Sequence, residues 1–151
     1  MAIPLKFLRE DYETLASEIA RLQQTTNPSI HERISLRLFL QMLGQILVVA
    51  PVCDGAVGIG STVTVRATVM RRAYNRDKRA YELVPLLGLD QKPHTVIEEV
   101  RIGSYFPFGP NGVTSYDSFV GRALLGARVG ETREWEVGGG QVIRYAVLAI
   151  E

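Results

Sequence analysis

The stretch NGVTSYDSFVGRALLGARVGETREWEVGGGQVIRYAVLAIE, residues 111–151, decides the fold. Asp117 or Ser118 is suited to cap a helix, because either side chain can accept a hydrogen bond from the helix's first free amides. Gly126 is suited to end that helix in a left-handed conformation. The apolar positions of the predicted short helix are Phe119, Val120, Leu124 and Leu125.

A terminal β-hairpin follows the short helix. Gly130 is the next expected positive-φ position, and Thr132–Val137 then alternates as a strand does. Gly138–Gly140 turns the chain into a longer strand, Gln141–Ile150. On that strand we expect one apolar face, made of Val142, Ala146, Leu148 and Ile150.

The motif ALLGARVGE, Ala123–Glu131, with the glycine turn and closing strand after it, resembles the C-terminal domain of the Gre transcript-cleavage factors and of Rnk. Trp135, four residues after Glu131, is more similar to Rnk than to the cleavage factors. Each of these residues taken singly also fits a plain helix stop and turn.

Length and composition bound the function classes. The 151 residues suit one compact domain or a small domain with an appendage, and an apolar content of 46% indicates a substantial core. A net charge of +1 does not favour strong nonspecific binding of DNA or RNA. A single cysteine, Cys53, fits a reducing cytoplasm. The start of the chain lacks a signal-peptide core, and Leu38–Cys53 is too short and too polar to span a bilayer. We therefore expect a cytoplasmic protein.

Residues 1–52 predict an antiparallel helical hairpin, a short coiled coil. The first helix has its apolar seam at Leu5, Leu8, Tyr12, Leu15, Ile19 and Leu22. Gln23–Ser29 breaks that pattern, and Ser29 with Glu32 forms a capping-box sequence that starts the second helix. The stripe on the second helix is Leu36, Leu40, Leu43 and Leu47, widened by Phe39, Met42 and Ile46. Because this helix is apolar on more than one side, the rest of the chain or a second copy could cover it.

Residues 53–151 predict a sheet domain. After a linker, Pro51–Gly60, the segment Ser61–Arg72 alternates as a strand whose core face is Val63, Val65, Ala67 and Val69. A turn at Tyr74–Lys78 leads to a second strand, Arg79–Leu87. Five cations surround this predicted hairpin: Arg71, Arg72, Arg76, Lys78 and Arg79. They indicate a solvated hairpin end, or else a contact with an acidic protein surface or a nucleic-acid backbone.

The segment 88–111 has no good counterpart in the Gre pattern and is interpreted as an insert. Within it, Thr95–Ile102 could form an extra strand. We expect the aromatic residues Tyr105, Phe106 and Phe108 to pack onto the sheet or under the helical hairpin, or to form an exposed patch.

No motif of the sequence calls for catalysis. His31 and His94 are isolated, and no zinc-site spacing, P-loop, dinucleotide fingerprint or nucleophile elbow occurs. We therefore expect no metal, no cofactor and no enzymatic activity.

The resemblance implies a fold and a partner. The implied fold is α+β: the N-terminal antiparallel helical hairpin plus an FKBP-like antiparallel sheet domain with one short helix. The implied function is binding to bacterial RNA polymerase near its secondary channel, with no sequence-specific nucleic-acid binding. In the Gre group the loop before the short helix contacts the polymerase, commonly through a Ser-Pro pair, here matched by Ser118 and Phe119. The neighbouring candidate contacts are Tyr116, Asp117 and Arg122.

The predicted hairpin tip separates this chain from the cleavage factors. Gre cleavage factors carry acidic tip residues that help to hold a metal ion in the polymerase. Here the tip residues are neutral: Gln24, Thr25, Thr26 and Asn27. We therefore expect polymerase binding without transcript cleavage. The alternatives are an FKBP-like peptidyl-prolyl isomerase, and a non-enzymatic module that forms a homodimer through the second helix.

Overall fold

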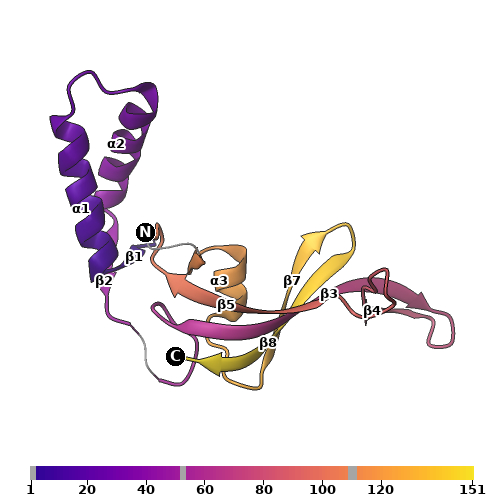
Figure 1. Ribbon diagram of the computed structural model, residues 1–151. Helices are drawn as coiled ribbons and strands as arrows, with labels where there is room; N and C mark the ends of the chain where they lie inside the picture. Colours follow the sequence, from indigo (N-terminus) through magenta and orange to yellow (C-terminus); the bar gives the residue numbers. More distant parts are fainter. Residues whose placement is uncertain (1–2, 52–53, 109–111) are drawn as a thin grey trace.

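The computed structural model describes residues 3–51, 54–108 and 112–151, so Cys53 and Asn111 lie outside the described residues. Two helices come first and a multi-stranded sheet with a short third helix follows, which confirms the α+β class (Figure 1). In chain order the elements are β1 (Leu5–Leu8), α1 (Arg9–Gln24), α2 (Ile30–Leu43), β2 (Ile46–Val49), β3 (Thr62–Asn75), β4 (Ala80–Pro85), β5 (Thr95–Gly103), β6 (Val113–Ser115), α3 (Phe119–Leu124), β7 (Thr132–Gly138) and β8 (Gln141–Ile150). No helix in the described part of the chain is long and apolar enough to cross a membrane.

The larger sheet is organised around β3. Its strands lie in the order β6-β5-β3-β8-β7, and β4 pairs with the distal part of β3. β3 runs antiparallel to β4, β5 and β8, whereas β5 and β6 are parallel. The segment 88–111 therefore contributes β5, which lies directly beside the central strand. The division of the chain at residue 52 stays a prediction.

One hydrophobic core lies on the α3 side of this sheet. From β3 it takes Val63 and Val65, both 0% exposed, and from α3 it takes Leu124, also 0% exposed. The predicted core face of β3 is thus confirmed for Val63, Val65 and Ala67.

The predicted core face of β8 is wrong for Ala146 and Leu148, because a β-bulge changes the register, whereas Val142 is buried and Ile150 packs against the core as predicted. Thr64 pairs with Ala149 but Val65 pairs with Val147, so Leu148 is the extra residue. Tyr145 and Val147 are buried in the core, and Ile143 and Ile150 pack against it. Regular alternation from the end of the strand would have placed Ala146 and Leu148 there instead.

A second hydrophobic core lies between α1 and α2. Leu15, Ile19 and Leu22 face it from α1, as predicted. From α2 the buried residues are Phe39 and Met42, which were predicted only to widen the stripe, and the predicted Leu36 packs against them. The predicted contacts Leu40 and Leu43 are 44% and 37% exposed, so the stripe assigned to α2 is rotated from the true one.

A short strand precedes α1 and another follows α2, so neither helix of this helical pair is as long as predicted. Leu5 and Leu8, predicted as helical seam positions, belong to β1, and Leu47 belongs to β2. β1 and β2 pair in parallel with Leu5 opposite Ile46 and Leu8 opposite Val49. Gly44 ends α2, and the pairing places the start and the end of the helical pair side by side.

Ser104, directly after β5, joins the helical pair to the sheet. The Ser104 hydroxyl is fully buried, accepts a hydrogen bond from the Leu8 amide at 2.8 Å, and donates one to Asp11 Oδ2 at 2.5 Å. Beside it the Tyr105 amide donates to the Lys6 carbonyl at 2.9 Å.

The aromatic residues after Ser104 pack against the helical pair. The Phe39 ring meets Phe106 edge-on at 5.5 Å and Phe108 at 6.3 Å, which confirms the packing under the helical pair for these two residues. Tyr105 is 36% exposed and is not part of this aromatic group. Together with the Ser104 hydrogen bonds, these rings fix the helical pair to the sheet at the C-terminal end of β5.

Phe39 is expected to contribute far more to stability than its neighbour Leu40. Phe39→Ala leaves a cavity against two aromatic rings and should lower the free energy of unfolding by about 3–5 kcal/mol. Leu40→Ala, at a half-exposed site, should cost about 1 kcal/mol or less. Urea unfolding compares the two variants, provided that the dependence of the unfolding free energy on urea concentration is the same for both. Equal midpoints would contradict this assignment of the α2 core face.

Candidate functional site

Two regions carry the sequence-predicted site residues: residues 116–122, and the turn at the tip of the helical pair. Only residues 116–118 of the first region form the loop before α3, because Phe119 and Arg122 already belong to the helix. Ser118 is the N-cap of α3, as predicted, because its Oγ accepts from the Gly121 amide at 3.0 Å. The same hydroxyl donates to the Ser115 carbonyl at 2.7 Å. Both of these hydrogen bonds hold the start of α3 against β6.

Gly121 explains how α3 can approach β6 so closely. A Cβ atom at position 121 would lie 2.2 Å from the Ser115 carbonyl oxygen and 2.9 Å from the Tyr116 backbone. Both contacts are with backbone atoms, which cannot rotate away, so only glycine fits.

Asp117 and Arg122 form an ion pair over the outer side of the loop. Arg122 donates to Asp117 Oδ1 from Nη2 at 2.9 Å and from Nε at 3.2 Å. Both side chains are well exposed, so the pair adds little to stability and leaves a carboxylate and a guanidinium at the surface.

Phe119 and Trp135 form the exposed aromatic element of this region. Their rings are stacked, with centroids 5.8 Å apart and an interplanar angle of 4°. Phe119 is 72% exposed, whereas Trp135 packs partly against the sheet core and donates from Nε1 to the Tyr145 hydroxyl at 3.3 Å. The sequence predicted Phe119 as an apolar position of α3 but gave no sign of its contact with Trp135, which comes from the next strand.

Tyr116 has a different role from its neighbours. Its hydroxyl accepts a hydrogen bond from the Lys6 amide at 3.0 Å, and its ring packs against the sheet core. Tyr116 therefore belongs to the joint between the helical pair and the sheet rather than to the exposed surface of residues 117–122.

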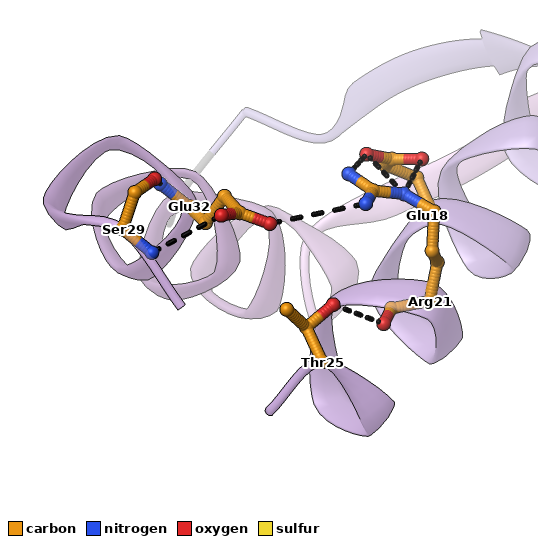
Figure 2. Close-up of polar contacts among 5 residues, drawn as sticks. All are labelled: Glu18, Arg21, Thr25, Ser29 and Glu32. Atoms are coloured by element: carbon orange, nitrogen blue, oxygen red, sulfur yellow. Dashed lines mark hydrogen bonds and ion pairs between the residues drawn. The ribbon is translucent and has the colours of Figure 1, made fainter. Parts of the chain in front are cut away.

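The tip of the helical pair is held by local polar contacts (Figure 2). Ser29 and Glu32 form the predicted capping box: the Glu32 amide donates to Ser29 Oγ at 3.2 Å, and the Ser29 amide donates to Glu32 Oε1 at 3.1 Å. On α1, Gln24 is the last helical residue and Thr25 Oγ1 donates to the Arg21 carbonyl at 2.9 Å. Asn27 takes a positive φ of 51°, a conformation that asparagine tolerates.

The carboxylates closest to the tip are occupied by internal partners. Arg21 donates to Glu18 from Nε at 3.0 Å and lies 3.9 Å from Glu32 Oε2 (Figure 2). The Arg21 hydrogen bonds lower the pKa of Glu18, and the backbone amide of Ser29 is the main cause of the lowered pKa of Glu32. Both groups are therefore ionised at neutral pH and directed toward the protein. Among the described residues there is no cluster of three or more side chains of the types that hold a metal ion.

Comparison with known proteins places the C-terminal segment in a family. Residues 109–151 match the family described as "Transcription elongation factor, GreA/GreB, C-term". The matched segment holds β6, α3, β7 and β8, together with the Ala123–Glu131 motif. The predicted resemblance to the Gre factors is thus confirmed for this segment, which is similar to the GreA/GreB C-terminal domain. No curated protein matches the sequence significantly.

Solved structures of transcription factors align along almost the whole chain at low identity. The transcription factor Gfh1 is 18% identical, with 100% of this chain and 99% of that chain covered and a TM-score of 0.37. The GreA/GreB elongation factor from Nitrosomonas europaea is 19% identical, with 97% of each chain covered and a TM-score of 0.36. Thermus aquaticus Gfh1 is 17% identical, with 99% of each chain covered and a TM-score of 0.36. At these TM-scores the overall likeness carries no further argument.

Protonation of Glu32 is expected to weaken the tip. Because its folded-state pKa lies below the ordinary value of 4.5, the stabilisation it gives is present above that pH and is lost as the pH falls through the folded pKa. Glu32→Gln should therefore melt at a lower temperature than the parent protein at pH 7, and the difference should be smaller in a second measurement at a pH well below 4.5. Thermal melts followed by circular dichroism at both pH values test this.

Glu13→Gln is the matched control for Glu32→Gln, because Glu13 is an exposed carboxylate on α1 outside the capping box. Its effect on the melting temperature should be small at both pH values. A pH-independent effect of Glu32→Gln would contradict the electrostatic account of the tip.

Proposed function

We propose that this protein is a transcription factor that binds bacterial RNA polymerase near the secondary channel and does not stimulate transcript cleavage. The observation that carries the proposal is the exposed Phe119 ring, stacked on Trp135 within the segment that matches the GreA/GreB C-terminal family. Aromatic residues and arginines frequently dominate the binding energy of protein interfaces, and Arg122 lies beside Phe119. A cytoplasmic location follows from this proposed partner.

The proposed contact surface consists of Asp117, Ser118, Phe119 and Arg122. The close approach of α3 to β6 at Gly121 and the Ser118 hydrogen bonds fix its backbone, so little conformational entropy is lost when a partner binds. The surface holds one exposed ring, one carboxylate and one guanidinium in fixed positions, which suits recognition of a protein partner with complementary charges. Tyr116 supports this surface from below rather than contacting the partner.

The absence of cleavage is proposed from the chemistry of the tip. Cleavage of the Gre type needs a free carboxylate that can reach a divalent cation, because hard cations prefer charged oxygen ligands. The tip residues 23–29 include no carboxylate, and Glu18 and Glu32 are held by Arg21 and the Ser29 amide. The 16 residues of α1 extend only about 24 Å at ~1.5 Å per residue. These features support the non-cleaving, Rnk-like branch.

A homodimer through α2 is less consistent with the charges. Ile30 and Ile34 are 74% and 59% exposed on α2, so the helix offers an apolar face. A two-fold pairing would place this face against itself. Arg33 and Arg37, both exposed, would then bring four cations into one interface. Repulsion among these cations would oppose the pairing, so we do not favour it.

Phe119→Ala is expected to weaken binding to core RNA polymerase about thirtyfold, the equivalent of ~2 kcal/mol. Its melting temperature should change little, because the removed ring is 72% exposed. Tyr81→Ala is a matched control, since Tyr81 is an equally exposed aromatic residue on a different part of the sheet. Fluorescence anisotropy of the labelled protein titrated with core polymerase measures both affinities. Undiminished binding by Phe119→Ala would remove this surface from the proposal.

A backtracked elongation complex tests the second half of the proposal. The protein alone should leave the RNA at its original length, because its tip supplies no free carboxylate. Added together with a cleavage factor, it should slow cleavage by competing for the polymerase, and Phe119→Ala should compete less well. Rapid RNA shortening by the protein alone would contradict the non-cleaving assignment.

A further inference from the structure

The distal part of β3, the turn after it and the first residues of β4 form an arm, residues 71–82, that projects from the sheet. In Figure 1 it lies on the opposite side of the sheet from the helical pair. Tyr74 pairs directly with Tyr81 across the two strands, and their rings meet edge-on at 5.3 Å. They are 54% and 72% exposed, so the two rings form an aromatic platform in solvent that the fold does not need for its core.

The arm is also the most cationic part of the chain. Residues 71–82 contain five Lys and Arg residues and two carboxylates, a net of +3, while the whole chain has a net charge of +1. Arg76 and Arg79 lie in the exposed turn, and neither forms an ion pair within the part of the chain that the structure describes. The small overall charge thus hides a local cationic site.

The strand register separates the carboxylate of the arm from the tyrosines. Because side chains alternate between faces, Tyr74 and Tyr81 share one face, and Glu82, opposite Ala73, lies on the other. Glu82 there accepts from Asn75 Nδ2 at 3.1 Å and lies 3.5 Å from Lys78 Nζ. The Glu82 carboxylate therefore does not lie next to the two tyrosine rings.

The turn that carries the cations is preorganised. The Asn75 side-chain carbonyl accepts from the Asp77 amide at 3.0 Å and from the Lys78 amide at 3.2 Å. Arg79 takes a positive φ of 50°, which closes the turn back onto Ala80 and Tyr81. The backbone of the turn that carries these cations is thus fixed directly beside the strands that carry the two rings.

We propose that this arm binds single-stranded nucleic acid without sequence preference. Bases would stack on Tyr74 and Tyr81, and the phosphates next to them would meet Arg76 and Arg79. Aromatic rings combined with a cationic track are the features that bind single strands, because every unpaired base offers a face for stacking. Each nucleotide of a single strand supplies both a base face for a ring and a phosphate for a cation, so it matches the two features together; an acidic protein surface is the alternative that the test below distinguishes. The site goes beyond the proposed polymerase contact and is independent of it, since it shares no residue with the surface around Phe119.

The test titrates fluorescently labelled oligouridylate and oligothymidylate of about 12 nucleotides with the full chain. We expect both to bind more tightly than a duplex of equal length, whose bases are already stacked. Between about 50 and about 200 mM salt, some three phosphate contacts should give a slope of log K against log salt of about −2. A higher affinity for one of the two oligonucleotides shows whether the arm prefers single-stranded RNA or single-stranded DNA.

The two components of the site can be separated by substitution. Tyr74→Ala with Tyr81→Ala should weaken binding at least about tenfold and leave the salt slope unchanged, because stacking is lost but no charge is. Tyr81→Phe should bind as the parent protein does, since it keeps the ring. Arg76→Gln with Arg79→Asn should weaken binding and reduce the magnitude of the slope by about 1–2.

Two controls make the result specific to the arm. Arg33→Gln with Arg37→Gln removes the same charge from α2, and Phe119→Ala removes an equally exposed ring, so neither should alter the affinity for the single strand. Full binding by the double tyrosine variant would overturn the proposal and indicate an acidic protein partner. The same conclusion would follow if poly-glutamate displaced the strand equally well from the parent protein and from the double tyrosine variant. Absence of binding at the lower salt concentration would also overturn it, whatever the polymerase assay shows.

Discussion

The hydroxyl of Ser104 is the contact on which the arrangement of the two halves depends. It lies in the buried joint, accepts from β1 through the Leu8 amide and donates to Asp11 in the first turn of α1. If the hydroxyl were absent, the part-buried Leu8 amide would lose its partner and the Asp11 carboxylate one of two, at a cost of about 1–3 kcal/mol in total. The Phe39 cluster supplies apolar area at this joint, but hydrogen bonds of fixed direction decide how the helical pair sits on the sheet.

Local signals in the sequence were reliable guides to local structure. The Ser29–Glu32 capping box, the Ser118 cap and the positive φ values of Gly126 and Gly130 were all predicted and are present. Each depends only on residues within a few positions, so the sequence nearby contains all the necessary information. The same holds for the alternating face of β3, whose strand is regular along most of its core half.

Features that depend on distant partners were predicted poorly. Leu5 and Leu8 have helical spacing to Tyr12, yet their pairing with β2 decides that they form a strand. On α2 eight of the 14 positions are apolar and they lie on more than one side of the helix, so its own pattern could not reveal that Phe39 meets rings from residues 106–108. In the candidate site the motif correctly indicated Ser118 and Gly126, but it could not indicate that Phe119 leaves the core to stack on Trp135.

The β-strand β3 serves two purposes in this fold. The first half of β3 is core, with Val63 and Val65 fully buried, and its distal end extends beyond its last pairing with β8 at Arg71, pairs with β4 and carries the exposed Tyr74. Because core strands are anchored by partners on both sides, an extension of such a strand is held more rigidly than a loop would be. A surface feature can thus gain a fixed geometry from a core to which it contributes nothing.

Gly121 has a consequence for how this sequence can diverge. The backbones of α3 and β6 approach each other there more closely than any side chain permits. Substitutions at most surface positions are nearly neutral, and core positions can change together if their volumes compensate. No compensating change elsewhere can make room for a Cβ against a carbonyl oxygen. Among lineages that keep this fold, position 121 should therefore stay glycine after most of the surrounding sequence has changed, which makes it a useful anchor for aligning remote homologues.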